Sequence, residues 1–83
     1  MKILYFAWIK SKVGRGQEEV ALPASVKTVR DLIEHLKSQG LEYQNAFANL
    51  AYIRTSLDQE FAHLETALEN TKEVAFFPPV TGG

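Results

Sequence analysis

The sequence predicts a single α+β domain in which a mixed β-sheet carries one main helix on one face. Three observations favour this fold: two apolar segments joined by a glycine-containing turn, one amphipathic helix, and several short β-rich segments after it. A chain of 83 residues buries only about 60–65% of its unfolded surface, so it has room for one core. The simplest packing of these elements is a roll of the β-grasp type.

The first strand is predicted over residues 2–10, whose letters are KILYFAWIK. Aromatic and β-branched side chains occupy both of its faces, which is typical of a central strand. Gly14 and Gly16 supply turn residues. The second strand is predicted over Gln17–Leu22, before Pro23, so the two strands should form an opening hairpin.

The clearest helix is predicted after Thr28, a suitable N-cap residue. Apolar residues follow at i, i+3, i+4 and i+7, and charged residues fall on the opposite side, as expected for a helix lying on a sheet. The apolar positions are Val29, Leu32, Ile33 and Leu36. Gly40 is placed to end this helix.

The remaining segments alternate between helix and strand signals. The expected elements are a short helix over 42–50 and strands over 51–55, 60–62 and 73–77. The predicted β-grasp domain therefore covers residues 1–77, and residues 78–83 form a projecting C-terminal tail.

Composition argues against several classes of function. Nine Lys and Arg balance ten Asp and Glu, and neither sign forms a run, so nucleic acid is not an expected partner. No apolar segment approaches the roughly 20 residues that span a bilayer, and the apolar run over 3–9 is too short for a signal-peptide core. We expect a cytoplasmic protein with no membrane association.

The chain contains no cysteine, which excludes disulfides, thiolate metal ligands and thiol nucleophiles. His35 and His63 are the only histidines, and neither lies in a metal-binding motif, so no metal site is expected. Any sulfur chemistry in which the protein takes part must therefore use sulfur delivered from elsewhere.

The C-terminus carries the chemical signal. Pro78 and Pro79 remove two backbone donors, so the chain must leave the sheet there. Val80 and Thr81 lead to Gly82–Gly83, a thin tip that ends in a carboxylate. Such a carboxylate could form an acyl adenylate with ATP in another protein's active site, and a sulfur nucleophile could then displace AMP. On spacing alone, a frayed end without function fits equally well.

The segment Glu73–Gly83, EVAFFPPVTGG, resembles the C-terminal signature of the molybdopterin synthase small subunits, a family of ubiquitin-like sulfur carriers. Leu4–Ala7 followed by Val13–Gly14 resembles the opening strand and turn of that family. The similarity covers nearly the whole chain. Many ubiquitin-like proteins end in Gly-Gly, but the VAFFPPVTGG context is much rarer.

The resemblance implies that a ubiquitin-activating-type enzyme uses ATP to adenylate Gly83, which is then converted to a thiocarboxylate. The thiocarboxylate would enter the synthase large subunit and give its sulfur to cyclic pyranopterin monophosphate, forming the dithiolene of molybdopterin. Two small subunits on a large-subunit dimer would make a heterotetramer. The chain itself would bind no cofactor, and its partner would supply most catalytic side chains.

Three positions depart from the family's pattern. Lys10 stands where Arg is frequent, Arg54 stands where Asn is common, and residues 69–72 replace an acidic Asp-Gly-Asp turn. The first change loses bidentate geometry, and the last alters a turn and the charge shown to a partner. Lys10 and Arg54 could also supply charges at the rim of a docking surface.

Side-chain alternation predicts the partner-binding residues. In the last strand Phe77 shares a face with Glu73, which should favour water, and alternation along residues 2–10 turns Phe6 outward as well. Phe61, on a short strand nearby, could extend this patch. Exposed aromatic side chains near the tail are candidates for docking, unless a loop or helix covers them.

Three other functions share some of these features. A carrier for thiazole synthesis or another thiocarboxylate pathway needs the same tail. A ubiquitin-like modifier would join Gly83 to a target lysine. A passive binding module would offer Pro78–Pro79 to an aromatic groove, and it would not need the terminal glycines.

Overall fold

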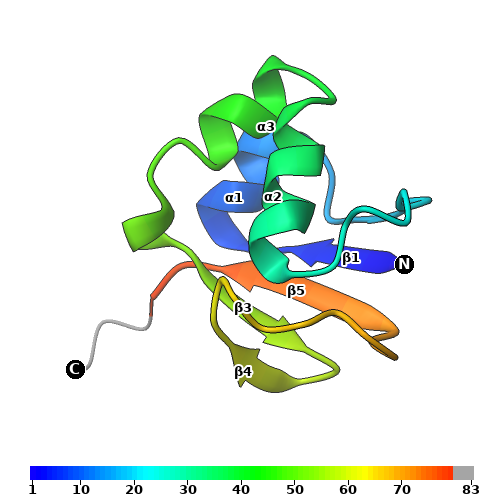
Figure 1. The fold of residues 1–83 in the computed structure, drawn as a ribbon. Coiled ribbons are helices and arrows are strands. Elements are labelled where there is room, and N and C mark those ends of the chain that lie inside the picture. Colours follow the sequence, from blue (N-terminus) through cyan, green and yellow to red (C-terminus); the bar gives the residue numbers. More distant parts are fainter. Residues whose placement is uncertain (80–83) are drawn as a thin grey trace.

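A computed structural model gives the structure of the protein and describes residues 1–79 (Figure 1). The strands are β1 (Lys2–Tyr5), β2 (Gln17–Glu19), β3 (Arg54–Leu57), β4 (Glu60–Ala62) and β5 (Glu73–Phe77). The helices are α1 (Ala7–Val13), α2 (Val29–Lys37), α3 (Leu41–Ala46) and a short 3-10 helix (Leu50–Tyr52).

The five strands form one mixed sheet in the order β2-β1-β5-β3-β4. β1 and β5 run parallel, and the other neighbours are antiparallel. The helices lie together on one face of the sheet, while the opposite face carries no helix (Figure 1). This arrangement is the predicted β-grasp fold, although its cover consists of more than one helix.

The prediction of a strand over residues 2–10 was wrong beyond Tyr5. The chain turns at Ala7, whose φ of 54° is positive, and α1 begins there. The predicted turn residue Gly14 instead ends α1 in the left-handed conformation, with a φ of 90°. Helix α1 buries Ile9 and Val13, which are four residues apart. That spacing is the helical signal that the high β-propensity of the run concealed.

Other boundaries differ by a few residues. β2 ends at Glu19 rather than Leu22, and β3 begins at Arg54 because the two residues before Ile53 lie in the 3-10 helix. Helix α2 ends at Lys37, so Gly40 precedes α3 instead of ending α2. The expected helix over 42–50 is the shorter α3.

The expected N-cap of α2 is confirmed with its full hydrogen-bond pattern. The Thr28 hydroxyl accepts from the Asp31 backbone N–H at 3.2 Å, and the Asp31 carboxylate accepts from the Thr28 N–H at 3.2 Å. The Lys27 N–H also donates to this carboxylate, and it is the main reason that the pKa of Asp31 falls below its usual range. A reciprocal pair of this kind fixes the first turn of the helix.

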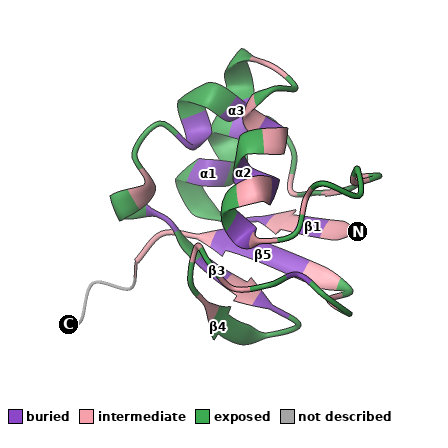
Figure 2. Cartoon of the chain, viewed as in Figure 1, coloured by how far each residue is buried: buried purple, intermediate pink, exposed green. Residues whose placement is uncertain are grey.

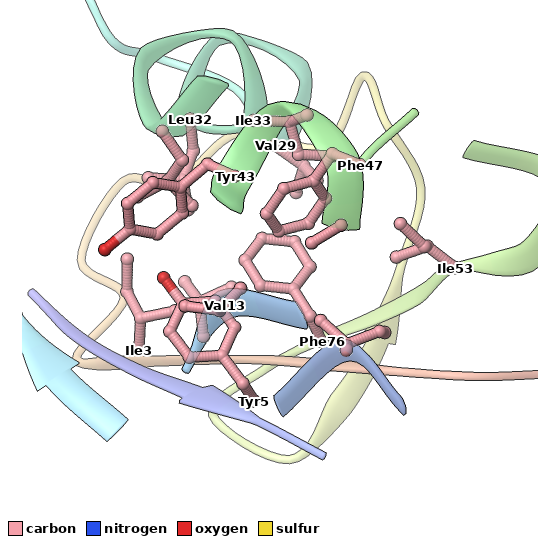
Figure 3. Close-up of a cluster of buried hydrophobic side chains, with 14 of the residues drawn as sticks. Ile3, Tyr5, Val13, Val29, Leu32, Ile33, Tyr43, Phe47, Ile53 and Phe76 are labelled. Atoms are coloured by element: carbon pink, nitrogen blue, oxygen red, sulfur yellow. The ribbon is translucent and has the colours of Figure 1, made fainter. Parts of the chain in front are cut away.

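The core lies between the helices and β1 and β5, and aromatic rings occupy its centre (Figure 3). Phe76 stacks on Tyr5, with ring centroids 6.2 Å apart, and meets the edge of Phe47 at 4.9 Å. All three rings are fully buried. Ile3 and the predicted apolar helix positions Leu32 and Leu36 are also buried. The sheet and the helices are thus joined through side chains that water does not reach.

A carboxylate closes one end of this core. The Glu18 Oε2 atom accepts hydrogen bonds from the hydroxyls of Tyr5 and Tyr43, each at 2.7 Å, and Arg15 pairs with the other oxygen at 3.2 Å. Figure 3 shows both hydroxyls at the same side of the cluster. Burial, reinforced by Glu18, raises the pKa of Tyr43 to about 12 and that of Tyr5 above its usual range. The arrangement ties β1, β2 and α3 together.

Candidate functional site

The predicted tail begins at the centre of the sheet. β5 ends at Phe77, with β1 on one side and β3 on the other. Tyr5 pairs with Phe76, and Arg54 pairs with Phe77, so both neighbours hold the last residues of β5. The Phe6 N–H adds a hydrogen bond to the Phe76 carbonyl at 3.1 Å. Pro78 and Pro79 therefore follow a firmly paired strand.

The residues predicted to carry the chemistry are Val80, Thr81, Gly82 and Gly83, and they lie outside the described residues. What the structure provides is the base from which they extend. Figure 1 locates that base at the end of β5, on the side of the sheet where β1 also ends. The candidate site consists of this base and the side chains around it.

Phe77 and Phe61 lie together on the face of the sheet that bears no helix. Phe77 is half-buried and Phe61 is 83% exposed, with ring centroids 5.9 Å apart. Because β3 separates β4 from β5, the two rings meet across that strand. We call Phe61 and Phe77 the aromatic pair. Figure 2 shows how β4 is exposed while most of β5 is buried.

Phe6 is 47% exposed, but it is not part of a long strand as the alternation argument assumed. It is the residue before α1, with an extended backbone (φ −123°, ψ 154°), so the alternation continues for only one residue past Tyr5. It also lies on the β1 side of β5, whereas Phe61 lies on the β4 side. The structure thus places Phe6 beside the base of the tail but separates it from Phe61.

A hollow of about 610 Å³ opens beside the aromatic pair. Its lining residues are Leu50, Ile53, Arg54, Thr55, Phe61, Ala62, His63, Leu64 and Phe77. The lining is mostly apolar, and its only ionisable side chains are those of Arg54 and His63. Arg54 was predicted from the sequence as a rim residue. His63 was not, because no motif placed this histidine near the tail.

Arg54 is held in place by the backbone. Its Nη1 atom donates to the carbonyls of Ala51 at 3.2 Å and Ile53 at 3.1 Å. The 3-10 helix before β3 presents these carbonyls, so the irregular segment that shortens β3 also positions the guanidinium. Lys10, the other expected rim charge, lies in α1.

The unusual turn before β5 is well formed despite having no glycine. Asn70 takes the left-handed conformation, with φ 63°, which asparagine tolerates better than most residues. The Asp58 carboxylate accepts backbone N–H groups from Lys72 at 3.1 Å and Glu73 at 2.9 Å. The departure at residues 69–72 therefore preserves the start of β5.

Residues 1–79 contain no group of three or more histidine, aspartate or glutamate side chains placed to hold a metal ion. Within the same residues, each helix is too short or too polar to cross a membrane.

Comparisons with known proteins agree over the full length of the chain. Residues 3–83 match the model of the ThiS family. The molybdopterin synthase sulfur carrier subunit of Escherichia coli K12 is 35% identical over 83 residues, covering 100% of this chain and 99% of the relative. The subunit of the same name from Haemophilus influenzae is 31% identical over 83 residues, with the same coverage.

A solved structure gives the same picture. The crystal structure of SAMP1 from Haloferax volcanii superposes with a TM-score of 0.77 at 25% identity. The match covers 100% of this chain and 98% of that one. The similarity therefore includes the whole β-grasp domain and the helices that cover it.

Proposed function

Because the chain belongs to the ThiS family, we propose that it is the sulfur carrier subunit of a molybdopterin synthase and that Gly83 carries the sulfur. The observation that supports this most strongly is the full-length similarity to sulfur carrier subunits of that synthase, at 35% and 31% identity. The family match runs through Gly82–Gly83 and the chain has no cysteine, so we assign the Gly83 carboxylate as the attachment point of the sulfur.

The proposed chemistry has two stages. In the first, the Gly83 carboxylate attacks the α-phosphorus of ATP in a ubiquitin-activating-type enzyme, and pyrophosphate leaves. A sulfur nucleophile then displaces AMP from the acyl carbon and leaves a thiocarboxylate. In the second, this sulfur forms a bond to a carbon of cyclic pyranopterin monophosphate in the large subunit as a carbon–oxygen bond at that carbon breaks. Water then cleaves the acyl–sulfur bond, which leaves the sulfur on the pterin and releases the Gly83 carboxylate, and a second thiocarboxylate supplies the other sulfur of the dithiolene. The chain requires no bound cofactor for either stage.

The described part of the chain supports this role by holding the tail's base rigid. β5 is paired on both sides up to Phe77, and two prolines follow. A stiff base narrows the positions open to the tip, which lowers the entropy cost of placing it in a partner's active site. Glycines at the tip leave the acyl carbon free of side-chain obstruction.

We propose that the aromatic pair docks onto the large subunit, with Phe6 as a separate contact on the other side of the tail's base. Exposed aromatic side chains are typical centres of protein interfaces, and each ring could contribute about 1.5–3 kcal/mol on burial. Two carriers on a large-subunit dimer would form a heterotetramer.

The experiment that tests the carrier function is a labelling assay. The purified protein is incubated with its adenylating enzyme, ATP and a sulfide source, and then with a thiol-directed alkylating reagent. Because the chain has no cysteine, we expect one ATP-dependent label, located at Gly83 by mass spectrometry. A variant without Gly82 and Gly83 serves as the control and should remain unlabelled while it melts at the same temperature as the wild type.

Adding the large subunit and cyclic pyranopterin monophosphate to the thiocarboxylate form of the protein, before alkylation, then tests the pathway. We expect dithiolene formation and recovery of the unmodified carboxylate. If an adenylating enzyme of shown activity gives no label, the sulfur carrier function is wrong. If instead Gly83 becomes joined to lysines of other proteins, the protein is a modifier.

A further inference from the structure

We propose that Arg54 binds an aspartate or glutamate side chain of the large subunit, and that the hollow beside the aromatic pair holds the apolar residue next to that carboxylate. This inference rests on the proposed function, because it identifies the chemistry of the surface that would cover the aromatic pair. It makes Arg54 a residue that determines partner specificity.

Arg54 is placed as a binding group rather than as a mobile surface charge. Its Nη1 atom is fixed by the carbonyls of Ala51 and Ile53. A guanidinium has five N–H donors, so anchoring through one nitrogen leaves the donors on Nε and Nη2 for a ligand. A fixed fork loses little side-chain entropy when it binds a carboxylate in a bidentate manner.

The charge of Arg54 is not compensated within residues 1–79. Four other cationic side chains there form ion pairs with carboxylates, namely Lys2 with Glu73, Arg15 with Glu18, Arg30 with Glu65 and Lys37 with Glu34. Arg54 is in no such pair among these residues, and the hollow that it lines has no acidic side chain. A partner that buries Arg54 must therefore supply the negative charge.

The position of Arg54 distinguishes it from the other cations without a carboxylate partner in residues 1–79, such as Lys27. Arg54 is the register partner of Phe77 on the neighbouring strand, and both line the same hollow. Lys27 lines a different hollow, with Met1 and Leu68. A partner that covers the aromatic pair would also exclude water from Arg54, and a charge-assisted hydrogen bond is stronger there than in water.

The remaining lining favours an apolar neighbour for the carboxylate. Leu50, Leu64 and the two rings of the aromatic pair are apolar residues of its lining, and His63 adds an imidazole. A partner that places a carboxylate on Arg54 and a neighbouring apolar side chain in the hollow would match both the guanidinium and the apolar lining. A basic or wholly polar surface would leave the guanidinium uncompensated on burial, which is costly.

The test compares two charge reversals in the full-length protein. Arg54→Glu and Lys27→Glu change the net charge equally, and both positions are exposed. The dissociation constant for the large subunit of the same organism is measured by calorimetry for the wild type and both variants, at about 50 and 300 mM salt. Melting temperatures check that each variant is folded.

We expect Arg54→Glu to weaken binding by about tenfold or more, and Lys27→Glu by less than about twofold. The loss of affinity for Arg54→Lys should lie between these two values, because lysine keeps the positive charge but cannot bind a carboxylate in a bidentate manner. The wild type should also lose more affinity with salt than Arg54→Glu does. When the acidic residues of the large subunit are replaced one at a time by lysine, one of these replacements should restore binding of Arg54→Glu.

Two results would overturn the inference, and they differ in whether the proposed carrier function fails as well. If the wild type binds the large subunit and the two reversals weaken binding equally, the role of Arg54 is wrong and the carrier function stands. If the wild type does not bind the large subunit at all, the proposed synthase function fails, and this inference fails with it.

Discussion

Phe76 and Phe77 are neighbours of the same type on the same strand, yet they lie on opposite faces of the sheet. Phe76 is fully buried between Tyr5 and Phe47, beneath the helices. Phe77 is half-buried on the face without helices, where it meets Phe61. One ring packs in the core and the other is partly exposed, so strand alternation rather than residue type decides which ring contributes to the core.

Two charged side chains, one on each face, also differ in how they are compensated. On the helix-covered face, Glu18 accepts two tyrosine hydroxyls and an arginine. On the other face, the Arg54 side chain donates hydrogen bonds only to backbone carbonyls among residues 1–79. A closed network contributes to folding, whereas an uncompensated cation beside exposed rings favours association. Four measurements test this contrast, in order of expected effect.

Phe76→Ala should produce the largest change. Removing this ring leaves a cavity between Tyr5 and Phe47, and we expect the free energy of unfolding to fall by about 3–5 kcal/mol. Chemical denaturation monitored by circular dichroism measures it. Phe77→Ala is the matched control and should lose less than about 1 kcal/mol; equal losses would mean that both faces are structural.

Phe77→Ala should instead weaken binding to the large subunit by about 1.5–3 kcal/mol, because the ring becomes fully buried only in the complex. Calorimetry on the wild type and the variant gives this difference. Leu41→Ala removes an exposed apolar side chain from α3 and should leave the affinity unchanged. An unchanged affinity for Phe77→Ala would exclude the aromatic pair from the interface.

Glu18→Ala should lower the free energy of unfolding by about 1–3 kcal/mol, since two buried hydroxyls lose their acceptor. The neighbouring Glu19 is a suitable control, because its carboxylate is exposed and contacts only the terminal amine at 3.5 Å among residues 1–79. Denaturation curves for both alanine variants give the comparison. If the Glu19 variant loses as much stability, the tyrosine network is not the cause.

Alkaline pH should weaken the same network. The pKa of Tyr43 is raised to about 12 in the folded protein, against about 10 for an unperturbed tyrosine. The stability that this shift contributes is complete below about pH 10 and is lost as the pH rises to about 12, because the unfolded chain releases its proton first.

Tyr43→Phe removes this titration. We expect its free energy of unfolding to decline less steeply than that of the wild type across the same range, by roughly 1 kcal/mol. Denaturation curves at several pH values measure the slopes. Parallel slopes would show that Tyr43 does not contribute to the alkaline loss.

The parts of the fold with strong local signals were predictable. The helix after Thr28 has both a capping box and regular apolar spacing, and it begins where expected. β4 and β5 have the predicted bounds, because turn residues flank each strand. Alternation along the last strand also predicted the partly exposed side of Phe77, and its neighbour Phe76 lies on the opposite, buried side.

The first helix was not predictable from propensity. Residues 2–10 have the composition of a strand, and the change to helix at Ala7 depends on tertiary packing of Ile9 and Val13 against the core. The position of His63 could not be predicted for a similar reason. Its place beside Arg54 depends on how β3 and β4 pair, which no local pattern of residues encodes.

The central position of β5 has a mechanical consequence. Because β1 and β5 are parallel and neighbouring, a force that pulls the N-terminus and the tail apart acts along both strands in opposite directions. Their hydrogen bonds then share the load together instead of opening one after another. A pull between the two termini therefore does not open the sheet from the end of β5.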